Sequence, residues 1–170
     1  WTRTTDSPGK IGDILLFFDV ERKIGECPLF LRRPHADEQL AHAAEVALDH
    51  VELAGRAAAV YPDPGVGPES ADCNGHGTWV AALAAGATAG VAPGALVRSV
   101  KVLGCDGSGG VSSVLAGVEW VMRNRAAPAV ALVAASGGPS PSLDEAVARS
   151  IAAGIPYVVA AGNSGADACD

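Results

Sequence analysis

The chain has 170 residues, of which 49% are hydrophobic and 18% charged, with a formal net charge of −7 and a pI near 5.0. This length suits one domain, and so high a hydrophobic content excludes a disordered chain. An acidic chain lacks the basic face that neutralises phosphate, so nucleic acid is not expected as a partner. No run of 18 apolar residues occurs, so no membrane span is predicted.

The first part of the chain has the least regular pattern. Residues 14–20 predict a short buried strand, and the prolines at 28 and 34 interrupt regular structure after it. Over residues 36–48, apolar side chains recur at helical spacing, which predicts a helix. Residues 61–75 are rich in proline, glycine and acidic groups and predict a loop.

Beyond residue 75, helices and strands alternate. The patterns predict helices at 78–85, 112–124 and 142–153, strands at 97–103, 129–135 and 157–161, and a glycine-rich loop at 104–110. In the third helix, Ser142 and Glu145 form a capping-box pattern, and Gly154 stands at the end. This alternation predicts an α/β fold in which helices flank a parallel sheet, with sites at the carboxyl ends of the strands.

The strongest chemical signal is the run Asp-Cys-Asn-Gly-His-Gly-Thr at 72–78. It places His76 between two glycines at the start of a helix, and histidine is the side chain best suited to take and return a proton near neutral pH. A helix N-terminus disfavours the imidazolium, so a base at this position needs a carboxylate partner. The alternative interpretation is a loop histidine with no chemical role.

Residues 74–78 resemble the histidine motif of the subtilases, the subtilisin-like serine proteases, and further segments follow in that family's order. These segments are Gly-Val-Ala-Pro-Gly-Ala at 90–95, Val-Lys-Val-Leu at 100–103, Gly-Ser-Gly at 107–109, Ala-Gly-Val-Glu-Trp-Val at 116–121 and Ala-Ala-Gly-Asn at 160–163. The similarity is nearest to the proteinase K and aqualysin branch. It implies a partial subtilisin-like peptidase domain at 50–170, incomplete at its C-terminus, preceded by a divergent segment of uncertain structure at 1–49.

The resemblance implies a serine endopeptidase that acts on polypeptides and needs no cofactor for catalysis. His76 would be the general base, and the Asn163 side chain would donate to the tetrahedral oxyanion. A plain turn residue is the alternative interpretation of Asn163. The remaining implied substrate-binding residues form two groups, an edge that pairs with the substrate backbone (Ser108, Gly109 and Gly110) and a wall of the specificity pocket (Ala160, Ala161 and Gly162).

Two members of the family's catalytic triad have no clear counterpart. The Gly-Thr-Ser motif of the nucleophile does not occur, so we expect a fragment that does not cleave peptides alone. Counting back from residues 50–57 puts Ala43 at the position of the aspartate, and Asp19 and Asp49 are the alternatives. A catalytically inactive, protein-binding subtilase or a gene remnant therefore stays open as a second interpretation. A nucleotide-binding domain is a further and more distant interpretation, because the glycines after residue 106 fit no phosphate-binding motif.

By the same resemblance, Cys73 and Cys105 would form a disulfide, which implies an extracellular or secretory setting although no signal peptide is visible. The Cys-x-x-His spacing of Cys73 and His76 leaves a zinc site as an alternative, but a second close pair of ligands is lacking. Calcium commonly braces this family, yet no carboxylate cluster in the sequence is distinctive enough to assign metal ligands. A monomer is expected.

Overall fold

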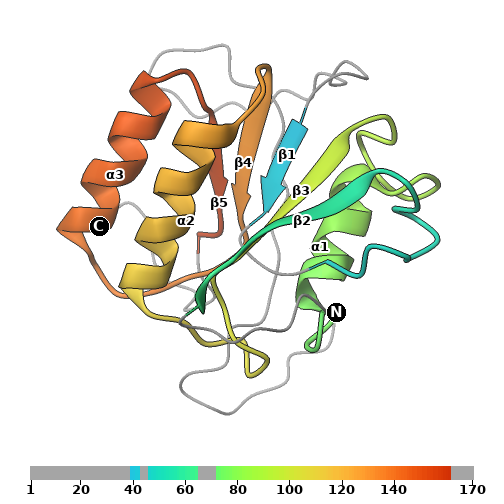
Figure 1. Cartoon of the computed structure of the whole chain (residues 1–170), viewed down its shortest axis with the longest axis horizontal. Helices are drawn as coiled ribbons and strands as arrows, with labels where there is room; N and C mark the ends of the chain where they lie inside the picture. The colour runs from blue at the N-terminus through green and yellow to red at the C-terminus, as the bar shows by residue number, and fades with distance from the viewer. Residues whose placement is uncertain (1–38, 43–45, 65–71, 162–170) are drawn as a thin grey trace.

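The computed structural model describes residues 39–42, 46–64 and 72–161. In chain order the elements are β1 (Gln39–His42), β2 (Ala57–Pro62), α1 (His76–Ala85), β3 (Leu96–Lys101), α2 (Val111–Asn124), β4 (Ala129–Val133), α3 (Pro141–Ala152) and β5 (Tyr157–Val159). The predicted α/β fold with a parallel sheet is confirmed (Figure 1). The predicted strand at 14–20 lies outside the described residues.

The five strands form one sheet in the order β2-β3-β1-β4-β5, and every pair in it is parallel. β1 lies at the centre, where Gln39 pairs with Leu96 of β3 on one side and with Ala129 of β4 on the other. The chain leaves β1 toward β2 and β3 and later continues on the opposite side with β4 and β5. The carboxyl end of β1 is therefore a switch point of the topology, the place where open α/β sheets form their binding crevices.

The helix predicted for residues 36–48 is wrong, because residues 39–42 form β1 and residues 46–50 are turn and irregular structure. The apolar residues there are mostly alanine, the residue with the highest helix propensity, but the preference amounts to less than about 1 kcal/mol per residue, and pairing with two neighbouring strands outweighs it. The loop predicted from residue 61 begins too early for a similar reason. Tyr61 and Pro62 end β2, an edge strand that pairs with β3 and that the sequence pattern did not indicate.

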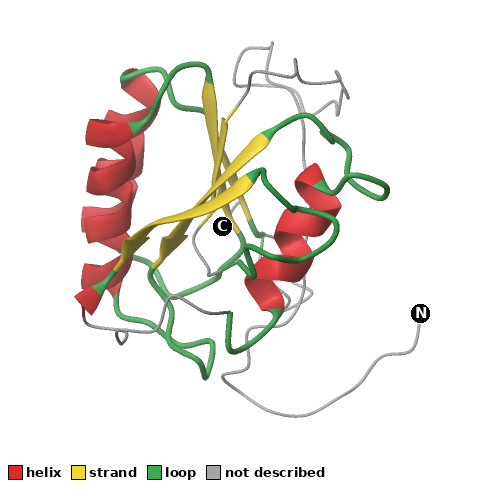
Figure 2. Cartoon of the chain, turned by 45° about the vertical axis from the view of Figure 1, so that its right-hand side comes forward, coloured by secondary structure: helices red, strands yellow, loops and turns green. Residues whose placement is uncertain are grey.

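The helices divide between the two faces of the sheet. α1 covers one face, whereas α2 and α3 lie together on the other (Figure 2). Buried side chains on the α1 side are mostly alanine and valine, and they are Val46, Leu53, Val80, Ala81, Ala84, Ala85, Ala92, Ala95, Val97, Leu132 and Ala134. On the α2 side, Gly117 permits close packing, because a Cβ atom there would lie 2.6 Å from Cγ1 of Val102. No helix in the described part is long and apolar enough to cross a membrane.

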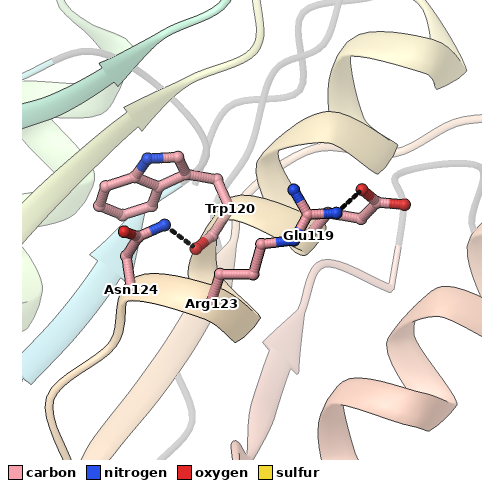
Figure 3. Close-up of polar contacts among 4 residues, drawn as sticks. All are labelled: Glu119, Trp120, Arg123 and Asn124. Atoms are coloured by element: carbon pink, nitrogen blue, oxygen red, sulfur yellow. Dashed lines mark hydrogen bonds and ion pairs between the residues drawn. The ribbon is translucent and has the colours of Figure 1, made fainter.

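α2 ends where the sequence predicts, at Asn124, and its last turn is closed by side chains (Figure 3). The Asn124 amide donates to the Trp120 carbonyl at 2.8 Å, and Arg123 forms an ion pair with Glu119 at 2.8 Å. A basic side chain in the last turn also suits the negative end of the helix dipole. These contacts are local, so they follow directly from the sequence of the helix.

α3 begins one residue earlier than predicted, and its cap differs. The N-cap is Ser140, whose hydroxyl accepts a hydrogen bond from the Leu143 amide at 3.4 Å. Pro141 occupies the first helical position, where its fixed φ angle suits the helix and its missing N–H costs nothing. The predicted capping box of Ser142 and Glu145 is therefore wrong, and Glu145 instead pairs with Arg149 at 2.8 Å.

Candidate functional site

His76 is the first residue of α1 and lies at the edge of the sheet where the parallel strands end. Gly75 precedes it with φ +84°, a left-handed conformation that turns the chain into the helix. The imidazole is half-buried, and its Nε2 atom lies 3.0 Å from the carbonyl oxygen of Ala134, which follows β4. A carbonyl only accepts hydrogen bonds, so this contact requires a proton on Nε2, and in a neutral ring the lone pair is then on Nδ1.

A carboxylate from outside the helix caps the turn that carries His76. Oδ1 of Asp72 accepts hydrogen bonds from the amides of Gly75 at 2.6 Å and Asn74 at 3.2 Å. Oδ2 accepts from the Thr78 amide at 2.9 Å and also from the Thr78 hydroxyl. Burial by itself raises the pKa of Asp72, but these hydrogen bonds together outweigh it and hold the pKa below its usual value. The carboxylate therefore stays ionised at the positive end of the helix dipole.

The Thr78 side chain joins this cap to the segment that follows β1. Its buried hydroxyl oxygen accepts a hydrogen bond from the Ala47 amide at 2.7 Å while the hydroxyl donates to Asp72. Val46, next to Ala47, is fully buried in the core beneath α1. The start of α1 is thus fixed relative to the carboxyl end of the central strand.

A disulfide ties the other side of the histidine segment to the glycine-rich loop. Cys73 and Cys105 are bonded, as the family resemblance implied. The side-chain amide of Asn74 adds a hydrogen bond to the Cys105 carbonyl at 3.2 Å. The disulfide occupies the Cys73 sulfur, so the zinc interpretation of Cys73 and His76 is wrong. Within the described ranges, no group of three or more His, Cys, Asp or Glu side chains could hold a metal ion, so no calcium ligands are assigned there.

The expected substrate edge is the exposed end of this loop. The carbonyl of Ser108 accepts a hydrogen bond from the Gly104 amide at 2.8 Å. The amide and the hydroxyl of Ser108 donate to the Asp106 carboxylate at 3.0 and 2.7 Å. Gly109 and Gly110 are exposed, and Gly110 is the N-cap of α2. The loop is therefore ordered by its own hydrogen bonds, and the role of these three residues in substrate binding stays a prediction.

The expected wall of the specificity pocket follows β5. The Ala160 amide donates to the Val133 carbonyl at 3.1 Å, which keeps residue 160 beside the end of β4. Ala161 is exposed, while Gly162 and Asn163 lie outside the described residues. Ala160 thus reaches the edge of the sheet where the His76 ring contacts Ala134. The roles of Ala160, Ala161, Gly162 and Asn163 stay predictions.

No described carboxylate is hydrogen-bonded to the His76 ring, whose contact goes to the Ala134 carbonyl. Asp49 lies in an exposed turn, and Asp19 and residue 43 lie outside the described ranges. The site also contains three residues whose roles were not predicted from the sequence, Asp72, Thr78 and Ala134. A signal for Asp72 was present, because an aspartate shortly before a helix commonly caps it. The contact to Ala134 had no signal in the sequence.

Comparison with known proteins gives a consistent result. The model of the Subtilase family matches residues 34–169, beginning within the segment that the sequence analysis treated as divergent. The chain is 48% identical over 124 residues to an extracellular serine proteinase of Thermus sp. (strain Rt41A), covering 73% of this chain and 30% of that protein. It is 45% identical over 121 residues to alkaline serine exoprotease A of Vibrio alginolyticus, covering 71% and 23%.

Among solved structures, the chain is similar to a cold-adapted subtilisin-like serine proteinase. The TM-score is 0.75 at 38% sequence identity, and the alignment covers 84% of this chain and 54% of that protein. The chain therefore spans about half of this solved structure and less than a third of the two curated relatives.

Proposed function

Since the chain belongs to the subtilase family, we propose that it forms part of a secreted serine endopeptidase that hydrolyses peptide bonds in polypeptide substrates. The observation that carries the proposal is the place of His76, at the first residue of α1 and beside the carboxyl end of β4. The names of the relatives and the Cys73–Cys105 disulfide support an extracellular setting. The nearer kinship with the proteinase K and aqualysin branch stays a prediction.

In the proposed reaction, His76 takes the tautomer with its proton on Nδ1, leaves the Ala134 contact, and accepts a proton at Nε2 from a serine hydroxyl as that oxygen attacks the scissile carbonyl; it then returns the proton to the leaving amine. The serine would come from a part of the full-length protein that this chain does not include. The side-chain amide of Asn163 would stabilise the oxyanion, and such a donor typically contributes about 3 kcal/mol to transition-state stabilisation. The exposed backbone at Gly109 and Gly110 would pair with the substrate.

The test measures peptide hydrolysis and labelling by a serine-directed fluorophosphonate in the full-length protein. We expect His76→Ala to lower kcat by about 10⁴-fold or more, as for other triad residues. The matched control is His50→Ala, because His50 is exposed and its ring accepts a hydrogen bond from the neighbouring Glu52 backbone amide at 3.3 Å. Hydrolysis that survives His76→Ala, or that falls equally with His50→Ala, would contradict the proposal.

A catalytically inactive, protein-binding subtilase is the second candidate. One observation favours it: β1 ends at His42 and alanine follows at position 43, where the resemblance places the triad aspartate. Loss of that aspartate alone lowers kcat by about 10⁴-fold in the serine proteases where it has been measured. This candidate predicts neither hydrolysis nor labelling of the full-length protein, together with saturable binding of polypeptides.

A further inference from the structure

The geometry points to Asp72 as a positioning residue for His76, acting through Thr78 to lock the first turn of α1 to the segment after β1. The effect of Asp72 on catalysis rests on the proposed function, whereas its effect on the position of His76 can be tested in this chain alone. Neither residue touches the imidazole through a hydrogen bond, so the effect passes through the backbone that carries His76.

The backbone around His76 needs an external restraint. His76 lies between Gly75 and Gly77, and glycine leaves the chain freer than any other residue. The N-cap, Gly75, has no side chain to close the first turn, and no acidic residue lies within that turn. Asp72 supplies the missing acceptors for Gly75 and for the Thr78 amide, on both sides of His76 in sequence. With the carboxylate in place, the first turn holds one conformation.

The Thr78 hydroxyl converts this local cap into a tertiary one. It donates to Asp72 and accepts from the Ala47 amide at 2.7 Å, across a sequence separation of 31 residues. Because Ala47 follows the central strand closely, the bond sets how far His76 lies from the carboxyl end of β1. A valine at position 78 would keep the shape but leave the Ala47 amide and an oxygen of Asp72 without this partner.

The Asp72–Thr78 pair is one of three restraints on the segment that carries His76. The Cys73–Cys105 disulfide holds it to the loop after β3, and the ring contact to Ala134 holds it to the end of β4. The Asp72–Thr78 pair adds the connection to β1. His76 is therefore fixed relative to the three strands that meet at the switch point, which is what a group that transfers a proton within hydrogen-bond reach requires.

The test uses NMR of the 170-residue chain with ¹⁵N-labelled histidine. We expect Asp72→Asn and Thr78→Val to displace or broaden the Nε2 signal of His76, because the ring loses its fixed place beside Ala134. Thr78→Ser keeps the hydroxyl and should restore the wild-type signal. Asp106→Asn is the matched control, since Asp106 also accepts hydrogen bonds from an amide and a hydroxyl, but both belong to Ser108 and neither bond reaches α1.

An unchanged His76 signal in folded Asp72→Asn and Thr78→Val would overturn the inference, and so would an equal change in Asp106→Asn. If Asp72→Asn does not fold, the Thr78→Val and Thr78→Ser pair decides by the same criterion. In the full-length protein, Asp72→Asn should lower kcat about tenfold or more with KM changed less than about twofold. Absence of turnover in the unmodified full-length protein would refute the proposed function, while the NMR result would still decide this inference.

Discussion

The helices α1 and α3 begin in opposite ways. α3 is capped by its own N-cap residue, Ser140, and Pro141 follows at the first helical position. α1 has a glycine at the N-cap and takes its cap from Asp72, three residues earlier, and its second tie from Ala47. The start of α3 is therefore stabilised locally, whereas the start of α1 is assembled from separate segments around the histidine that the proposed site needs.

The two helices also differ in how much of each is buried. Most of α1 is buried, including the fully buried Val80 and Ala84, whereas the buried residues of α3 are Ala146 and Ser150. Packing of an apolar face supplies most of the stability of a helix in a protein. α1 can thus tolerate a glycine at its N-cap because the core and its tethers hold it, and α3 relies more on its cap.

The largest expected effect comes from removing the tether of α1 to the loop after β3. Replacing Cys73 and Cys105 by serine opens a loop with a sequence separation of 32 and should lower the free energy of unfolding by about 4 kcal/mol. Urea denaturation measures the loss. Hydrogen exchange should quicken at the Thr78 amide more than at the Leu143 amide of α3, and equal acceleration at both would remove the contrast between the two helix starts.

The next effect distinguishes the two caps by pH, because only one of them titrates. The pKa of Asp72 is lowered in the folded protein, so its contribution is fully present above the ordinary value of 3.8 and is lost as the pH falls through the lower folded value. Asp72→Asn should cost about 1 kcal/mol near neutral pH, because asparagine keeps one acceptor oxygen but replaces the other by an NH₂ group that cannot accept a hydrogen bond. The difference from wild type in thermal or urea unfolding should shrink below about pH 4; a difference that stays constant into acid would contradict this role of the carboxylate.

The smallest effect concerns the cap of α3. Ser140→Ala should lower the free energy of unfolding by about 0.5–1 kcal/mol, equally at pH 7 and pH 3, because a hydroxyl does not titrate in this range. Ser142→Ala is the matched control and should change stability by less than about 0.5 kcal/mol. If Ser142→Ala lowers the free energy of unfolding more than Ser140→Ala, the N-cap is Ser142, as the sequence pattern predicted.

The sequence alone was sufficient for the parts of the fold whose signals are local. Beyond residue 75, apolar spacing and punctuation by glycine and proline located each helix and strand to within a few residues, and the motif around His76 indicated the family. The pairing of Cys73 with Cys105 also followed from that resemblance. These features were readable because the residues that determine them lie within one element or one motif.

Tertiary structure decided β1, β2 and the surroundings of His76. β1 has only four residues and β2 begins with three alanines, so neither has a clear pattern of its own, and strands far along the chain supply their hydrogen-bond partners. The contacts that hold the histidine segment join Ala47 to Thr78 across 31 residues and His76 to Ala134 across 58. The sequence determined which residue could carry a proton, and the folded sheet determined what surrounds it, because backbone partners far apart in sequence have no side-chain pattern by which they could be recognised.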